Sequence, residues 1–220
     1  MYNKYFKHEK GITGLETAII LIAFVVVAAV FAYTALSAGL FSTQKAQEAV
    51  YSGLKEARST LELRGPVIAT ANNTSAGGAI GTIKQITFTL SNVLGGEAID
   101  FNPPTANTPS DGKALTGTGA TNKVVINYID QTQKVTNLYW TITKLGKDDG
   151  DNLLETNEKF QVIVGYTTNG TLGGNLIDAL SSNYLGVNKT FDLEVVTPVG
   201  AILSIERTTP PYIDTIMNLR

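Results

Sequence analysis

The 220-residue sequence contains no cysteine and one histidine, His8. Without cysteine, neither a disulfide framework nor a metal site built on thiolates can form. Cysteine and histidine are also common nucleophiles, general bases and metal ligands, and removal of a short N-terminal leader would leave a chain with neither. Carboxylate pairs are then the remaining route to acid–base catalysis, and the sequence singles out none. The composition therefore favours a protein that is not an enzyme and requires no cofactor.

Clustered positive charge is also missing. The formal net charge is −2, and every lysine or arginine after residue 10 stands alone in the sequence. A nucleic-acid partner would need a basic stripe or patch, so we expect none. The glycine-rich stretch Gly77-Gly78-Ala79-Ile80-Gly81 lacks the Lys-Ser/Thr pair that completes a phosphate-binding loop.

The most conspicuous absence is charge between Glu16 and Lys45, a stretch of 28 residues whose centre reads IILIAFVVVAAVF. About 20 apolar residues are enough to cross a bilayer as a helix. In lipid each backbone group must be paired within the segment, which forces the helical conformation. The lysines before the stretch would keep the leader in the cytoplasm and place the remaining chain outside.

A secretory signal peptide is cut after its apolar stretch. Here the processing point, Gly11 followed by Ile12, precedes that stretch, so cutting would remove the leader and keep the helix. Glu16 lies at the start of the apolar run, where an unpaired carboxylate is costly at membrane depth. The new α-amino group on Ile12, from the same or a neighbouring chain, would offset that cost.

The helical pattern continues beyond the apolar run. Between Lys45 and Leu63, apolar side chains recur at steps of four, three and four and form one stripe. These residues are Val50, Leu54, Ala57 and Leu61. Because Gly65-Pro66 would end the helix, the sequence predicts one long helix from near Thr13 to about Leu63.

These residues carry a resemblance to a known family. Gly11-Ile12, Glu16 and the apolar run resemble the class III signal and first helix of type IV pilin-like proteins. Within that superfamily, residues 14–65 are similar to archaellins, the archaeal flagellins that build the archaeal swimming filament. The segments LIAFVVVAAVFAY, LSAGLF and TQKAQEAVYSGLKEA carry this similarity.

The resemblance implies a structural subunit that polymerises through its N-terminal helix for motility. A prepilin-like membrane peptidase would cut after Gly11, and an assembly platform would move the helix from the membrane into the filament core. Small residues let such helices approach closely. They are Ala28, Ala29, Ala32, Ala35, Ser37, Ala38 and Gly39. The partner would be the chain itself or paralogous subunits, in an extracellular filament on the cell surface.

Two alternative functions share parts of this pattern. An acidic residue at the position of Glu16 is typical of bacterial pilins, so a type IV adhesion pilus subunit is one alternative. A membrane-anchored extracellular binding domain is the other, and such a protein would keep its N-terminus uncut.

After Pro66 the apolar residues alternate with a period of two, as in Ile86-Thr87-Phe88-Thr89-Leu90. Glycine- and proline-rich turns separate the expected strands. The strands are 66–71, 82–91, 97–102, 123–128, 136–145, 159–166, 189–196 and 201–207. We therefore expect an α+β protein with a cleaved leader (1–11), a long helix (12–64) and an antiparallel, immunoglobulin-like β-sandwich (65–220).

Two further kinds of site follow from local sequence. Asn72, Asn73, Asn169 and Asn188 each begin an Asn-X-Ser/Thr sequon and are candidates for N-linked glycans on an extracellular domain. The segment KDDGDNLLETNE also resembles a calcium loop with lysine at its first position. Its oxygen ligands to Ca²⁺ would come from Asp149, Asp151, the Leu153 carbonyl, Glu155 and Glu158. A solvated acidic turn between two strands is the alternative.

Overall fold

A computed structural model describes residues 9–58, 61–72, 81–93, 96–107, 110–165, 174–181 and 183–219. In the N-terminal helix, side chains are described from residue 14 to residue 54. The chain divides into two compact units, Met1–Gly53 and Leu54–Arg220, and each is described by itself below.

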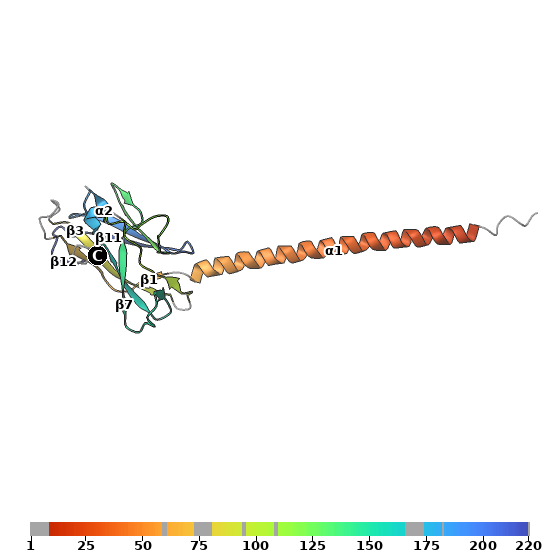
Figure 1. Ribbon diagram of the computed structural model, residues 1–220, viewed down its shortest axis with the longest axis horizontal. Helices are drawn as coiled ribbons and strands as arrows, with labels where there is room; N and C mark the ends of the chain where they lie inside the picture. The colour runs from red at the N-terminus through yellow and green to blue at the C-terminus, as the bar shows by residue number, and fades with distance from the viewer. Residues whose placement is uncertain are drawn as a thin grey trace, which may run out of the picture. The chain divides into compact units, whose positions relative to one another are not determined.

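Helix α1 spans Glu9–Arg58 without a break (Figure 1). Its sequence has no proline, and isolated glycines such as Gly39 lower helix stability by only about 1 kcal/mol each. The helix ends earlier than the periodic stripe predicts, so the prediction of an end near Leu63 is wrong. Leu61 instead begins strand β1 (Leu61–Leu63), because its backbone pairs with that of Asn92.

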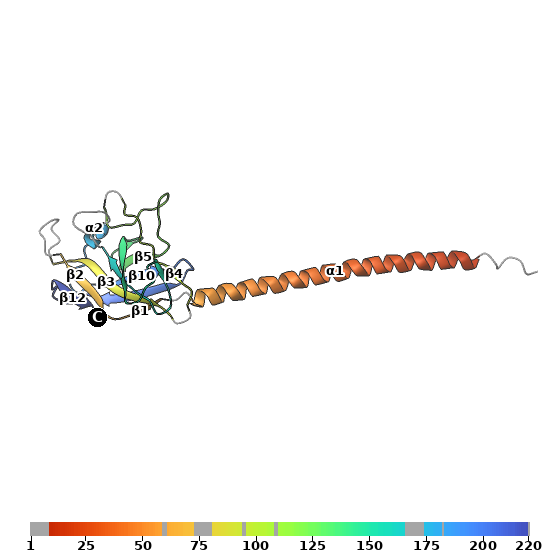
Figure 2. The same ribbon diagram turned by 60° about the horizontal axis from the view of Figure 1, so that its bottom comes forward.

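The larger sheet has six antiparallel strands, in the order β12-β2-β3-β9-β7 with β1 also paired to β3. Figure 2 shows β12, β2 and β3 side by side. Since β9 pairs with Ile86–Ser91 along one edge of β3, β1 and β2 follow each other along its opposite edge. The strands are β2 (Val67–Ala71), β3 (Ile83–Asn92), β7 (Trp140–Leu145), β9 (Lys159–Val164) and β12 (Ile216–Leu219).

The second sheet has four strands in the order β11-β10-β5-β6. It contains β5 (Val125–Asp130), β6 (Lys134–Val135), β10 (Thr190–Val196) and β11 (Ile202–Thr208). A short pair, β4 (Ile99–Asp100) with β8 (Leu153–Leu154), forms the third sheet. The prediction of an antiparallel β-sandwich after a long helix is confirmed.

One hydrophobic core joins the two main sheets. The inward side chains of β3 and β9, such as Phe88 and Val162, belong to the same buried cluster as Ile126 and Leu193 of the second sheet. This alternation is what the period-two pattern dictates, because successive side chains of a strand point to opposite faces. Trp140, on the edge strand β7, is fully buried in this core, and the ring of Phe101 packs edge-on against it at a centroid distance of 5.8 Å.

A short helix, α2 (Leu176–Leu180), closes one part of this core. Asn175 caps it, and its side chain accepts hydrogen bonds from the backbone of Ile177 and Asp178. Gly165 lies so close that a Cβ atom there would be 2.5 Å from the Leu176 nitrogen. Only glycine fits this position, which also has φ of +76°.

Candidate assembly surface

The apolar side chains of α1 surround the helix instead of forming one stripe. They run from Leu15 to Leu54, and each is between 49% and 74% exposed within the chain. The core of the β-sandwich, by contrast, has its large side chains almost fully buried. Such a helix is stable only when other apolar matter surrounds it, either lipid or further helices. By length and composition, one helix in the described part of the chain, Gly14–Leu54, is able to span a membrane.

Three threonine hydroxyls in this part of α1 are satisfied within the helix. The hydroxyls of Thr17, Thr34 and Thr43 donate hydrogen bonds of 2.9–3.0 Å to the carbonyls three residues earlier. Each threonine can therefore enter an apolar environment without an unpaired hydroxyl. The small residues Ala28, Ala32, Ala35 and Gly39 recur at helical spacing and leave one face of α1 thin enough for close helix contact.

Glu16 is the one charged side chain described between Gly14 and Gln44. Its side chain is exposed, and within the described residues it makes no hydrogen bond or ion pair. The backbone of α1 is helical through Gly11 and Ile12, so Ile12 lies one turn before Glu16. Residues four apart on a helix are neighbours on its surface, which places the predicted α-amino group within reach of this carboxylate.

The apolar region gives way to a charged one at Lys45. Lys45 and Glu48 form an ion pair of 2.6 Å, with side chains 60% and 69% exposed. Exposed pairs of this kind contribute at most about 1 kcal/mol, so the pair mainly marks where α1 becomes compatible with water. The uncharged part of α1 is thus bounded on both sides, by Glu16 and by Lys45.

Comparison with known proteins finds similarity to archaeal flagellins over most of the chain. Residues 11–207 match the archaeal-type flagellin family. The chain is 39% identical over 220 residues to "Probable flagellin 1" of Archaeoglobus fulgidus, covering 98% of both chains. It is 32% identical to "Probable flagellin 1" of Aeropyrum pernix, covering 95% of this chain and 96% of that protein. A subunit of the archaeal flagellum of Methanospirillum hungatei strain JF1 superposes with a TM-score of 0.61 at 27% identity, covering 94% and 98% of the two chains.

A helix with apolar side chains on every side, followed by a separate β-sandwich, defines a filament-forming structural subunit. The chain belongs to the archaeal-type flagellin family. It is a structural subunit of the archaellum, the archaeal swimming filament, and the filament lies on the cell surface. The family supports this function over the adhesion pilus and membrane anchor that the helix alone leaves open.

The acidic segment does not gather its side chains around one point. Asp149 and Asp151 each accept a hydrogen bond from the backbone two residues later, at 3.2 and 2.8 Å. Glu158 turns back to accept a hydrogen bond of 3.0 Å from the backbone nitrogen of Glu155. No group of three or more acidic side chains in the described part of the chain is arranged to hold a metal ion. The calcium site at Asp149, Asp151, Leu153, Glu155 and Glu158 stays a prediction, without support from this arrangement.

The sequons differ in accessibility. Asn188 is exposed at a turn before β10, with φ of 51°. Asn72 is only 6% exposed, so its amide is shielded from a glycan-transferring enzyme in the folded domain. Asn73 and Asn169 lie outside the described residues. Of the sequons that the structure describes, Asn188 is therefore the one suited to carry a glycan.

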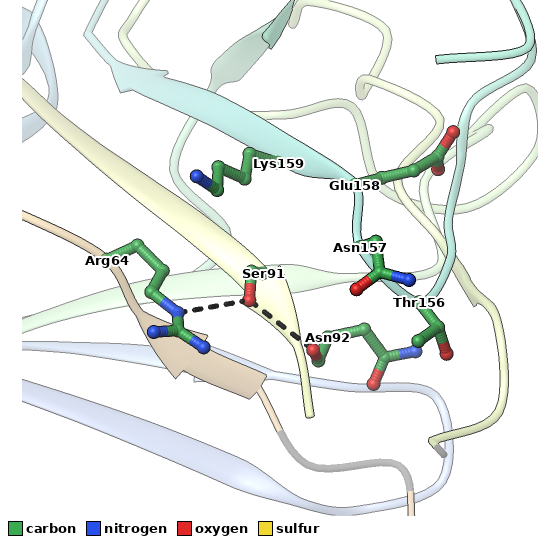
Figure 3. A pocket seen from close by; sticks show the side chains of 7 residues that line it. All are labelled: Arg64, Ser91, Asn92, Thr156, Asn157, Glu158 and Lys159. Carbon is green, nitrogen blue, oxygen red and sulfur yellow. Dashed lines mark hydrogen bonds between the residues drawn. The ribbon is translucent and has the colours of Figure 1, made fainter. Parts of the chain in front are cut away.

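A polar pocket of about 440 Å³ opens at one end of the larger sheet (Figure 3). Its lining residues are Arg64, Ser91, Asn92, Thr156, Asn157, Glu158 and Lys159. Arg64 donates to Ser91 Oγ at 3.4 Å and forms an ion pair of 2.9 Å with Glu62. Sequence alone does not reveal this pocket, because Arg64 and Lys159 are 95 residues apart and only the pairing of β3 with its neighbours brings them together.

Proposed function

We propose that this archaellum subunit is made as a membrane-inserted precursor, is cut after Gly11, and then polymerises through α1. The single observation that supports the route is that exposed apolar side chains surround α1, above all in the uncharged stretch between Glu16 and Lys45. The membrane satisfies this surface before assembly, and sister helices satisfy it afterwards. Both environments exclude water, so the helix never has to be exposed to it.

The apolar surface is large enough to hold a polymer together. Burial of one large apolar side chain contributes about 1.5–3 kcal/mol. The exposed set on α1 includes Ile20, Phe24, Phe31, Leu36 and Phe41, among others. A contribution on the order of tens of kcal/mol per helix is thus available before the cost of ordering the subunits is subtracted.

Cutting after Gly11 creates a new positive charge on Ile12, four residues before Glu16. A carboxylate near a helix N-terminus is also favoured by the partial positive charge of the unpaired backbone N–H groups there. We infer that Glu16 offsets the Ile12 amine, of its own or of a neighbouring chain, when the helix enters the filament core. The pair would let both charges leave water together.

The β-sandwich would form the outer, extracellular layer of the filament, with an N-linked glycan on Asn188. Its role is structural, and we propose no catalytic activity for it. The partners are further copies of this chain or paralogous subunits, together with a prepilin-like membrane peptidase and an assembly platform that act on the precursor.

The N-terminus of filaments sheared from cells tests this route. Intact-mass and peptide mass spectrometry should give Ile12 as the first residue, and Gly11→Val should leave the uncut precursor in the membrane fraction. Filaments built of chains that retain Met1 or other leader residues would contradict the proposed processing. A subunit found only in the membrane fraction, without extracellular filaments, would contradict the proposed polymerisation.

A further inference from the structure

The outward face of the four-stranded sheet carries two carboxylates directly opposite each other. Asp192 on β10 pairs in register with Glu206 on β11. Like charges in directly opposite positions destabilise an antiparallel pair. Lys134 does not neutralise either carboxylate, because its amine forms an ion pair of 3.5 Å with Glu194.

Neither carboxylate has a cationic partner in the part of the chain that the structure describes. Asp192 accepts a hydrogen bond of 2.8 Å from the Ser204 hydroxyl, and the guanidinium of Arg207 donates to the backbone oxygen of Glu206, not to its carboxylate. Glu206 is exposed. This arrangement is unfavourable in an isolated domain and favourable next to a cation from another molecule.

The outward face of the larger sheet carries two cations at one end, Lys159 and Arg64, of which Arg64 already forms an ion pair of 2.9 Å with Glu62. Lys159 lies in register with Ser91 and through it with Glu62, so these side chains share one face of the sheet. The lysine is exposed and makes no ion pair within the described residues. Figure 3 shows Lys159 and Arg64 lining the same pocket, while the carboxylate of Glu158 points away from both.

Both faces also carry an apolar row. On the larger sheet the row has Ile68 and Ile163 on either side of Thr87, and all three are partly exposed. The polar residues Asn218 and Thr141 flank this row in register. On the smaller sheet the row is Ile202, Val196 and Val125, and Ile202 is 60% exposed. The two rows have no charged member.

The distance between the apolar row and the charged row is the same on the two faces. Ile163 follows Lys159 by four residues on β9, and Val196 follows Asp192 by four residues on β10. Four residues of a strand span about 13 Å. When the apolar rows of the two faces meet, the basic and acidic rows can therefore meet as well. The row between them is uncharged on the larger sheet, with Gln161 beside Thr89. On the smaller sheet it holds Ser204, Asn127 and Glu194, and the charge of Glu194 is met by Lys134 within the same domain.

We propose that neighbouring subunits in the filament join their outer domains through these two faces, with Asp192 and Glu206 of one copy against Arg64 and Lys159 of the next. Glu206 enters the polar pocket beside Lys159. The faces belong to different sheets of one sandwich, so the contact is heterologous and repeats without closing, as a helical polymer requires. This inference rests on the proposed polymerisation through α1 and adds a second contact to it.

A disulfide experiment tests the contact directly, because the natural chain contains no cysteine. Filaments of the variant Lys159→Cys/Glu206→Cys, oxidised and run on a non-reducing gel, should give a ladder of covalent oligomers. Each single variant lacks a matching thiol and should stay monomeric. The control Lys159→Cys/Thr118→Cys places the second thiol on an exposed loop that belongs to neither sheet, and it should give no ladder.

The result separates this inference from the proposed function. Filaments that form normally but give no ladder overturn the contact and leave polymerisation intact. A wild-type chain that forms no filaments overturns polymerisation itself.

A charge swap covers the case in which the cysteine variant does not assemble. Glu206→Lys and Lys159→Glu should each lower filament yield at low ionic strength several-fold, and the double variant should restore it. Lys113→Glu is the control and should leave the yield unchanged. Single variants without effect, or a double variant no better than the singles, would overturn the contact.

Discussion

The hydroxyl of Tyr128 donates a hydrogen bond of 2.9 Å to Oδ2 of Asp130 at the end of β5. Asp130 also accepts hydrogen bonds from the backbone nitrogens of Thr132 and Gln133, at 2.6 and 2.9 Å. This carboxylate therefore closes the turn that joins β5 to β6. Burial, the hydrogen bond to Asp130 and its negative charge all raise the pKa of Tyr128 far above its ordinary value, so the hydroxyl stays protonated and remains a donor.

The same network should make the β-sandwich domain sensitive to acid. Partial burial would raise the pKa of Asp130, but the hydrogen bonds from Thr132, Tyr128 and Gln133 outweigh it and lower the pKa from 3.8 to about 2. A carboxylate with a lowered pKa stabilises the fold above its unfolded pKa and loses that contribution as the pH falls through the folded pKa. The free energy of unfolding should thus fall between about pH 4 and pH 2, by about 1 kcal/mol from this group once solvent screening is allowed for.

Guanidinium unfolding of residues 54–220 at a series of pH values measures this effect. Trp140, the one tryptophan, is fully buried and reports unfolding by fluorescence. Asp130→Asn should lose this part of the acid dependence, whereas Asp148→Asn, on an exposed turn, should keep it. An Asp130→Asn domain with the same acid dependence as the natural one would contradict the role of this carboxylate.

Gly165 and Gly146 form a matched pair for testing how α2 is packed. Both have positive φ, +76° and +84°, but only Gly165 has other atoms where a Cβ would lie. Gly146→Ala should cost about 1 kcal/mol from backbone strain alone. Gly165→Ala should cost several kcal/mol more, because the Cβ would meet the backbone of Leu176 and of Lys84. Equal losses of unfolding free energy in the two variants, measured by the same assay, would contradict this packing. They would show that α2 moves away from the added Cβ at little cost.

Part of this architecture is predictable from the sequence. The apolar run fixes α1 because nothing within it breaks a helix. The alternation in Ile86–Leu90 of β3 and along β10 fixes which side chains face the core. The end of α1 is not predictable in this way. Leu61 continues the helical stripe, yet the free edge of β3 beside Asn92 recruits it into a strand. The helical periodicity around Leu61 contains no information about Asn92, the residue 31 positions away with which Leu61 pairs.

The short elements cannot be predicted from the sequence, for a related reason. Strand β12 follows Pro210-Pro211 and has four residues, too few to display a period, and it forms because β2 has an unpaired edge. The pocket at Arg64 and the pair Asp192–Glu206 likewise depend on strand register. Once the pairing of β10 with β11 is known, the alternation in each strand shows that the two carboxylates face outward together.

Substitution of Glu16 tests its role in assembly. Glu16→Val removes the carboxylate that would offset the Ile12 amine and should lower the yield of sheared filaments severalfold. Thr34→Val is the control, because it makes α1 more apolar at a position whose hydroxyl is already satisfied by Phe31. The pelleted filament, quantified per cell, is the measurement. Equal yields from Glu16→Val and the natural chain would rule out the charge pairing.

The predicted glycan should be lost with Asn188. Intact mass of the subunit from sheared filaments should fall by the mass of one glycan in Asn188→Gln, because this sequon is exposed. Asn72→Gln should leave the mass unchanged apart from the substitution itself, since Asn72 is buried. A glycan found on Asn72, or none on Asn188, would contradict this assignment.

The central claim is that α1 leaves lipid and is surrounded by copies of itself. A reconstruction of sheared filaments by electron cryomicroscopy tests it most directly. We expect residues 14–44 of every subunit to lie in the filament core, with the apolar side chains of α1 in contact with neighbouring helices. A filament whose core is formed by the β-sandwich domains, with α1 outside the core, would contradict the account.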